Sequence, residues 1–111
     1  MEILQTLDVS VPIDPGVVVS LTMRLDFPAT LTQIMIDPGF RMLEVRIGNT
    51  CVFFARPGDQ AAPLIKLPID TKDVYGRPCT RIFPELDLSL RVERVDKGPR
   101  ALTVHVSGER G

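Results

Sequence analysis

Apolar and polar residues alternate along much of this chain, and the longest alternation covers residues 17–27. Apolar side chains occupy one phase and mainly polar ones the other: Val17, Val19, Leu21, Met23, Leu25 and Phe27 alternate with Val18, Ser20, Thr22, Arg24 and Asp26. Successive side chains of a β-strand point to opposite faces, whereas a helix would scatter these apolar residues around its axis. The pattern therefore predicts a strand that is buried on one face.

The same period of two predicts seven further strands, over residues 3–11, 30–37, 41–47, 50–55, 64–69, 85–95 and 101–107. Ten prolines and eight glycines interrupt the chain at intervals that suit short strands better than helices. In the first of these strands the predicted buried face holds Ile3, Leu7, Val9 and Val11, with Gln5 as the mismatch. Residues 108–111 carry no such pattern, so we expect a frayed tail.

One strand and two longer segments depart from simple alternation. Leu31 and Ile34 cannot share one face, which predicts either a bulge near Thr32-Gln33 or a strand that begins at Thr32. Residues 56–63 and 70–84 are irregular by composition, and their length suits connections that cross between two sheets. A single helical turn over residues 71–75 is the alternative for part of the second segment.

Two short breaks predict β-hairpins. Gly48-Asn49 separates two alternating runs, and glycine and asparagine accept the positive φ that tight primed turns require. Asp96-Lys97-Gly98-Pro99 separates residues 85–95 from residues 101–107, which predicts a second hairpin. The first of these hairpins is the strongest local signal in the chain.

Short strands with one apolar and one polar face must close on themselves or stack as two sheets. We therefore expect residues 1–111 to form a single-domain, all-β, antiparallel β-sandwich of about eight strands, of jelly-roll or Greek-key type. An immunoglobulin-like sandwich is the second choice, although the chain lacks tryptophan and the Cys-Trp-Cys spacing of immunoglobulin domains.

Composition narrows the classes of partner. Hydrophobic residues make up 44% of the 111 residues and charged residues 24%, an ordinary balance for one globular domain. The formal net charge is -1 with both signs mixed, which argues against a nucleic-acid partner held through its phosphates. No apolar run approaches the roughly 18 residues of a transmembrane segment, and Met1 to Gln5 lacks the features of a signal peptide. We expect no membrane partner, and a location in the cytoplasm or in a virion.

Few side chains are candidates for catalysis or for a disulfide bond. His105, the one histidine, falls on the polar phase of its strand, and no nucleophile motif accompanies it. Cys51 and Cys79 show no CxxC spacing and are expected to be free thiols, with a disulfide as the alternative. The chain is therefore expected not to be an enzyme and to need no cofactor.

The aspartates in the loops are candidate calcium ligands. Asp14 together with Asp70 or Asp73 could form a site at one end of the sandwich, with backbone carbonyls completing it. No DxDxDG spacing occurs, and aspartate is common in turns because its side chain bonds local backbone amides. We therefore predict no metal site and keep a calcium-binding module as an alternative.

The candidate contact residues lie around the first hairpin. Phe53 and Phe54 are adjacent in a predicted strand, so one faces the core and the other the surface. An exposed phenylalanine is typical of a subunit contact, and the tip residues Gly48 and Asn49 lie in the same hairpin. Two other surfaces suit subunit contacts: the small outward run Val18-Ser20-Thr22, and residues 1–7 as a strand added to a neighbouring sheet.

The order of these segments resembles small β-sandwich structural proteins of viral particles. The resemblance rests on Phe27-Pro28, the strand over residues 31–36, the run from Phe40 to Ile47-Gly48-Asn49, a proline-rich loop, and the late segments 86–90 and 104–108. It covers most of the chain as a pattern, with Ile47-Gly48-Asn49 as the one compact motif. It implies a capsid, decorating or spike-anchoring role with repeated self-contacts, and it carries over no catalytic residue.

We therefore expect a non-enzymatic structural protein, a capsid-type or capsid-decorating subunit, whose partners are further copies of itself or a larger protein scaffold. The alternative is a small ligand- or calcium-binding β-sandwich module, similar to C2 or carbohydrate-binding domains. The mass of the native protein in solution distinguishes the two hypotheses, because a structural subunit assembles and a binding module stays a monomer.

Overall fold

The computed structural model describes residues 1–59, 61–68, 76 and 79–111, which form nine β-strands and no helix. The strands are β1 (Glu2–Ile13), β2 (Val18–Met23), β3 (Ala29–Ile36), β4 (Phe40–Ile47), β5 (Thr50–Phe54), β6 (Leu64–Lys66), β7 (Arg81–Ile82), β8 (Leu88–Arg94) and β9 (Arg100–Arg110). The all-β prediction is confirmed. The number of strands is nine and not about eight, because the two-residue β7 forms within a segment predicted to be irregular.

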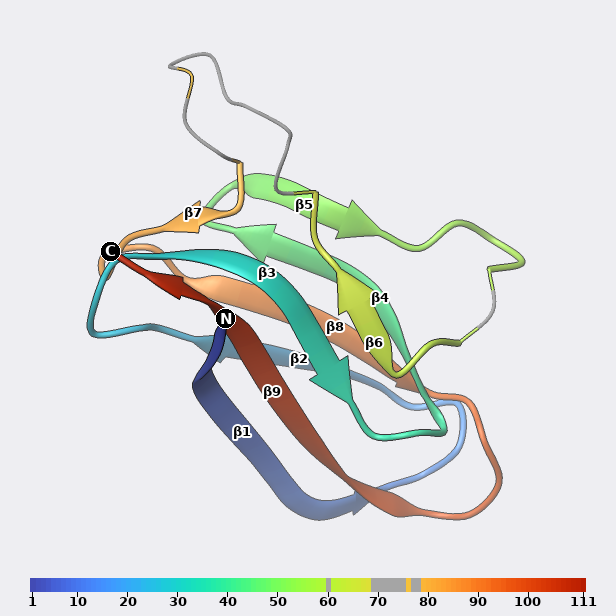
Figure 1. Cartoon of the computed structure of the whole chain (residues 1–111). Coiled ribbons are helices and arrows are strands. Elements are labelled where there is room, and N and C mark those ends of the chain that lie inside the picture. Colours follow the sequence, from blue (N-terminus) through green and yellow to red (C-terminus); the bar gives the residue numbers. More distant parts are fainter. Residues whose placement is uncertain (60, 69–75, 77–78) are drawn as a thin grey trace.

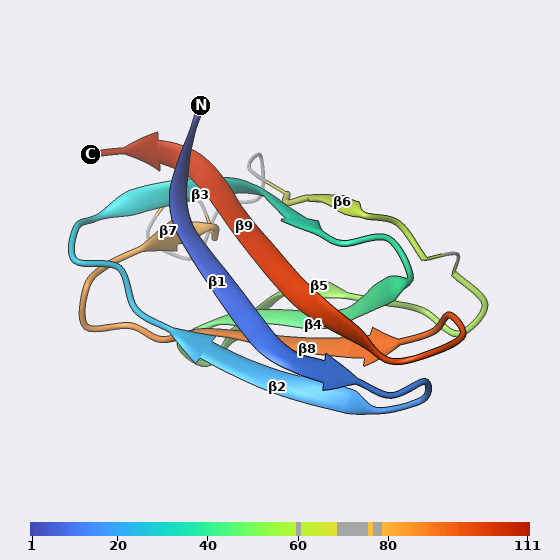
Figure 2. The ribbon, with the colours of Figure 1, turned by 90° about the horizontal axis from the view of Figure 1, so that it is seen from below.

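The strands form two antiparallel sheets that face each other like the layers of a sandwich (Figure 1). Sheet A has the order β1-β9-β3-β6, with β7 also paired to β3, and sheet B has the order β2-β8-β4-β5. The buried apolar side chains of both sheets form one cluster, in which Leu31 and Ile34 of β3 and Val45 of β4 have no exposed surface. In Figure 2, which views the molecule from below, β1 and β9 of sheet A run diagonally across the strands of sheet B.

Strands from the two halves of the chain pair in nested order. β4 pairs with β5, β3 with β6, β2 with β8 and β1 with β9, all antiparallel. The chain therefore pairs with itself like one long hairpin whose arms are folded over into two layers. The tip of that long hairpin is the Gly48-Asn49 turn.

The hairpin at Gly48-Asn49 is confirmed, since Ile47 pairs directly with Thr50. Gly48 has a φ of 57°, and no residue other than glycine has a positive φ among the described residues. A positive φ at the first central position alone is the pattern of a type II′ turn. Glycine is therefore the residue required at this tip, and the conformational tolerance of Asn49 is not used.

The second predicted hairpin is wrong. β8 belongs to sheet B and β9 to sheet A, so the turn at residues 96–99 joins the two layers. Each strand buries an apolar face: Leu88, Leu90 and Val92 on β8, and Leu102, Val104 and Val106 on β9. These two faces cover each other better from opposite layers than side by side in one sheet, and turn composition alone does not distinguish the two arrangements.

The side chain of Arg94 stabilises this crossing. Its Nε donates to the carbonyl of Gly98 at 3.2 Å, and its Nη2 donates to the carbonyl of Lys97 at 3.1 Å. Its Nη1 donates to the carbonyl of Gly39 in the turn before β4, at 2.6 Å, and its guanidinium lies 5.1 Å from the ring centre of Phe40. One buried cation thus joins two turns that are far apart in sequence.

The predicted buried face of the first strand is partly wrong. A register shift between Ile3 and Gln5 in the pairing with β9 turns Leu4 into the core and leaves Ile3 59% exposed. A second shift after Val9 leaves Val11 exposed as well. The first irregularity exchanges the inner and outer phases, which a count of alternating residues cannot register. The second inserts two extra residues in β1, so the phase is the same on either side of it although the residues within it face outward.

Two other predictions concern the bulge in β3 and the end of β2. The bulge near Thr32-Gln33 is confirmed by a register shift between Leu31 and Gln33. β2 keeps the predicted inward phase but ends at Met23, because the partner strand β8 begins opposite it at Leu88. Beyond that point the chain has no neighbouring strand to pair with.

The tail and one connection also differ from expectation. Residues 108–110 belong to β9 and pair with β3, and Gly108 also pairs with β1, so the predicted frayed tail is wrong. The link between β5 and β6 crosses between the sheets as predicted, whereas the second crossing follows Ile82, because β6 and β7 both pair with β3. Ile69 and the possible helical turn at residues 71–75 lie outside the described residues.

Candidate functional site

The hairpin tip is held in place by the segment before β8. The Gly48 amide donates to the carbonyl of Asp87 at 2.8 Å, and a side chain at position 48 would come within 3.2 Å of Leu86. Asn49 is exposed, and its carbonyl accepts a bond from Arg46 at 3.1 Å. Of the two predicted contact residues at the tip, Gly48 therefore forms a structural corner, and Asn49 alone is open to a partner.

The two phenylalanines separate as predicted. Phe53 lies opposite the fully buried Val45 and points between the sheets, where it is half-buried. Phe54 lies opposite Glu44 on the outer face of sheet B and is 64% exposed. The structure therefore leaves Phe54 as the available contact side chain, whereas Phe53 belongs to the wall of a pocket.

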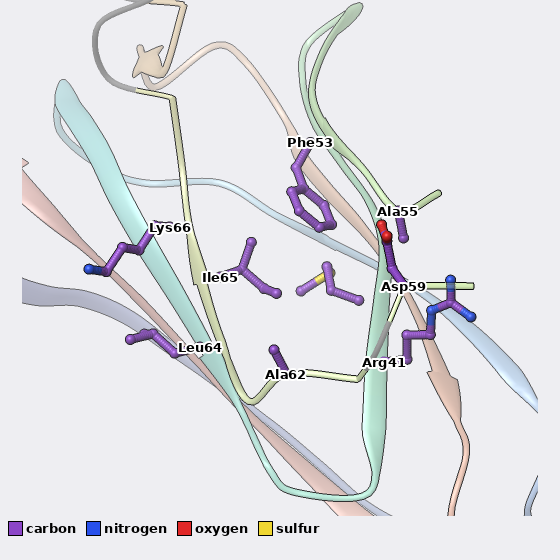
Figure 3. Close-up of a pocket in the computed structure, with 9 residues that line it drawn as sticks. Arg41, Phe53, Ala55, Asp59, Ala62, Leu64, Ile65 and Lys66 are labelled. Atoms are coloured by element: carbon purple, nitrogen blue, oxygen red, sulfur yellow. The ribbon is translucent and has the colours of Figure 1, made fainter. Parts of the chain in front are cut away.

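That pocket lies between the sheets on the side where β5 and β6 form their edges (Figure 3). Its volume is about 350 Å³, and its lining comprises Arg41, Met42, Phe53, Ala55, Asp59, Ala62, Leu64, Ile65 and Lys66. Phe53, Ala62 and Ile65 point into the same space, whereas Lys66 points away from it (Figure 3). The interior is thus apolar, and its polar groups lie at the rim.

Arg41 is the cation of this rim. It lies between the inward-facing Phe40 and Met42, so its side chain leaves the outer face of β4 and reaches the rim of the pocket at the edge of sheet B. Its Nη2 donates to the carbonyl of Arg56 at 2.8 Å, while its Nε is buried and has no hydrogen-bond partner within the described part of the chain. The nearby Asp59 carboxylate accepts from the Arg56 amide at 2.8 Å and closes its own turn. Arg41 therefore lies beside an apolar pocket without a carboxylate partner among the described residues.

The outer face of sheet A has a second, shallower depression of about 210 Å³. It is lined by Met1, Glu2, Ile3, Gln33, Met35, His105 and Ser107. Met35 is 44% exposed and has Leu64 beside it on β6 and His105 beside it on β9. The middle of this face is therefore built from uncharged and apolar side chains that no other part of the described chain covers.

The outer face of sheet B is different. Its central strands present charged side chains of both signs: Arg41, Glu44 and Arg46 on β4, with Arg91 and Glu93 on β8. Arg46 and Glu44 form an ion pair at 3.8 Å. Such a face remains solvated at little cost, so the two sides of the sandwich differ in how readily they lose water.

The predicted chemical candidates do not converge. His105 is half-buried on the outer face of sheet A, and its Nδ1 lies 3.0 Å from the hydroxyl of Thr6. Within residues 1–59, 61–68, 76 and 79–111, no group of three or more potential metal ligands occurs. Asp70 and Asp73 lie outside those residues. Cys51 is exposed, Cys79 is half-buried, and both are free thiols.

Comparisons with protein-family models, curated proteins and solved structures give no match, so the resemblance to viral β-sandwich proteins stays a prediction. No helix that is long and apolar enough to cross a membrane occurs in the described part of the chain.

Sequence reasoning missed the outer face of sheet A. Met35 lies on the outward phase between the buried Ile34 and Ile36, and that position was a readable signal for an exposed apolar side chain. Leu64 gave the same signal beside Ile65. Ile3 could not be found in this way, because it reaches the surface only through the bulge in β1.

Proposed function

We propose that this chain is a non-enzymatic structural subunit, of capsid or capsid-decorating type, that makes repeated contacts with copies of itself or with a larger protein scaffold. The observation that carries the proposal is the difference between the two outer faces. Sheet B presents charges of both signs, whereas sheet A exposes Ile3, Met35 and Leu64 around a depression in which Glu2 is the one acidic or basic side chain besides His105. Exposed apolar surface of this kind is typical of a protein-protein interface.

The topology supports the same class. We propose that the fold is a jelly roll with β7 added, because the nested pairs β1–β9, β2–β8, β3–β6 and β4–β5 are those of one long hairpin folded into two Greek keys. Jelly rolls are frequent in viral capsid domains. Fold class alone does not determine function, so the argument rests on the surface of sheet A.

Sedimentation velocity over a range of protein concentrations tests the assembly proposal. We expect the wild-type chain to form species larger than a monomer, and Met35→Lys to weaken their association about tenfold or more, equivalent to ~1.4 kcal/mol. The physical reason is that a lysine ammonium buried in an apolar contact loses hydration without gaining a partner. Circular dichroism checks that the variant remains folded.

The matched control is Ser89→Lys, which adds the same charge in the middle of the outer face of sheet B. We expect this variant to associate like the wild type. A wild-type chain that stays monomeric at the highest concentration and joins no particle would contradict the proposed function.

The second candidate function is binding of a small apolar carboxylate in the pocket between β5 and β6. The observation that favours it is Arg41, a cation beside an apolar interior of about 350 Å³ with a buried Nε that lacks an acceptor. Pockets with an apolar lining and one well-placed polar group are typical of small-molecule sites. A carboxylate would provide the missing acceptor.

Titration with decanoate, followed by NMR chemical shifts, tests this second function. We expect shifts at Phe53 and Ile65 in the wild type and binding at least tenfold weaker in Arg41→Gln, which removes the cation. Arg91→Gln removes an exposed cation from the outer face of sheet B and should leave binding unchanged. Shifts of equal size in both variants would exclude a specific role for Arg41.

A further inference from the structure

The edge strands of the two sheets differ in how well they are protected from pairing with another chain. In sheet A, β1 carries Glu2, Asp8 and Pro12, β6 carries Lys66 and is flanked by Pro63 and Pro68, and the two-residue β7 carries Arg81. In sheet B, β2 reads Val-Val-Ser-Leu-Thr-Met and β5 reads Thr-Cys-Val-Phe-Phe, without charge or proline. Charges and prolines are the usual protection of sheet edges, so only the edges of sheet B lack it.

Both unprotected edges also expose apolar side chains. Phe54 of β5 is 64% exposed and Val18 of β2 is 40% exposed, both on the outer face of sheet B. The two strands lie at opposite ends of that sheet, as Figures 1 and 2 show. Among the described residues, the backbone bonds of both strands go to their neighbours β8 and β4, and none goes to the outer side.

The direction of the strands makes the two edges complementary. Sheet B has four antiparallel strands, so β2 and β5 run in opposite directions. If a second copy is placed beside the first in the same orientation, its β2 runs antiparallel to the β5 of the first copy. An even number of antiparallel strands thus permits the sheet to repeat from copy to copy without a change in hydrogen-bond pattern.

The register brings the exposed side chains together. Across sheet B, Phe54 lies in one row with Glu44, Arg91 and Ser20. Continued into a second copy, this row places Phe54 opposite Ser20 and diagonal to Val18 of that copy. Diagonal neighbours of this kind are within reach of an aromatic side chain.

From these observations we propose that sheet B continues from one copy to the next, with β5 of one copy paired to β2 of its neighbour. This inference rests on the proposed assembly function and identifies one of its contacts. Each copy offers both edges, so the contact is head-to-tail and generates a ring or an open filament. The apolar patch around Met35 on the outer face of sheet A stays free for a second contact.

A disulfide test follows from the row that contains Cys51. Cys51 lies in line with Arg46, Ser89 and Thr22 across sheet B. Within one copy, residues 22 and 51 are three strand spacings apart, about 14 Å, too far for a disulfide. A bond between Cys51 and a cysteine introduced by Thr22→Cys can therefore form only between copies.

The experiment is mild oxidation of Thr22→Cys combined with Cys79→Ala, followed by non-reducing electrophoresis. We expect a ladder of dimers, trimers and larger species. The control is Ser10→Cys with Cys79→Ala, which places an exposed cysteine on the protected edge strand β1 and should give no ladder above the dimer. Dimers alone, formed equally without Thr22→Cys, would show a two-fold β5-to-β5 contact and overturn the proposal.

A charge at the edge provides an independent measurement. Phe54→Lys should lower association about tenfold or more in sedimentation velocity, whereas Ser89→Lys, at the centre of the same face, should not. If the wild type assembles and Met35→Lys weakens assembly while Phe54→Lys and the Thr22→Cys ladder have no effect, the edge contact is wrong and the assembly function stands. If the wild type does not assemble, the proposed function itself fails.

Discussion

Arg94→Met is expected to lower the free energy of unfolding by about 3 kcal/mol. Arg94 is only 3% exposed, and its guanidinium donates to the carbonyls of Gly39, Lys97 and Gly98. Methionine fills similar space but leaves these three acceptors without their donor. Each carbonyl that loses its partner in a partly buried site costs about 1 kcal/mol or more.

The position of Gly39 shows how closely this site is packed. Gly39 has a φ of 88°, and a Cβ built there would overlap Nη1 of Arg94. The turn before β4 thus needs glycine for two reasons, its backbone conformation and the space taken by the guanidinium. Arg94 and Gly39 together join the turn that enters β4 to the turn that leaves β8.

Urea unfolding followed by far-ultraviolet circular dichroism measures the effect of Arg94→Met. The control is Arg91→Met, because Arg91 lies on the same strand with its side chain exposed, and we expect a change within about 0.5 kcal/mol there. Arg94→Lys should also destabilise, since one ammonium cannot replace three N–H groups of a planar fork. Equal stability of Arg94→Met and Arg91→Met would contradict the role assigned to the buried guanidinium.

Gly108→Ala is expected to cost about 3 kcal/mol or to prevent folding. Gly108 lies in the central strand β9, next to the bulge of β3. A Cβ at this position would overlap the carbonyl oxygen of Thr30 and would lie 3.1 Å from Cα of Leu31. The obstacle is backbone and not a flexible side chain, so relief requires β9 and β3 to move apart.

The control for this prediction is Gly58→Ala. Gly58 has a φ of 90° and open space around its Cα, so alanine there tests backbone strain alone, at about 1 kcal/mol. Both variants are compared by urea and thermal unfolding. A loss in Gly108→Ala no greater than that in Gly58→Ala would show that β9 and β3 accommodate the extra methyl group.

These two sites explain how a fold with such distant pairings is specified. β1 and β9 come from opposite ends of the chain, and β9 must approach β3 closely enough to exclude a side chain at position 108. Arg94 makes the corresponding connection at the other end of β9. Both contacts join segments that are far apart in sequence. The alternation of apolar and polar residues predicts each strand separately and does not predict such contacts.

The sequence alone was sufficient for the class of the elements and for much of the core. Alternation placed Val19, Leu21 and Met23 inward on β2, and Leu88, Leu90 and Val92 inward on β8, and the structure confirms both phases. It also predicted the bulge in β3 and the hairpin at Gly48-Asn49. These features are local, because strand periodicity and turn conformation depend on neighbouring residues.

The candidate site was predictable in part. The split between Phe53 and Phe54 followed from their adjacency in a strand. The pocket beside Arg41 was not predictable, because its walls come from β4, β5, β6 and the loop between the last two. The exposed edges of sheet B were equally hidden, since an edge exists only once the order of the strands is known.

Tertiary structure determined which strands pair, and which residues of a strand face the core where the sequence pattern and the packing disagree. The turn at residues 96–99 has hairpin composition, yet burial of two apolar faces sends β8 and β9 into different sheets. Ile3 has the predicted inward phase, yet pairing with β9 turns Leu4 inward instead. The physical reason is the same in both cases: periodicity specifies a face for each strand, and only packing against distant strands specifies its partners and register.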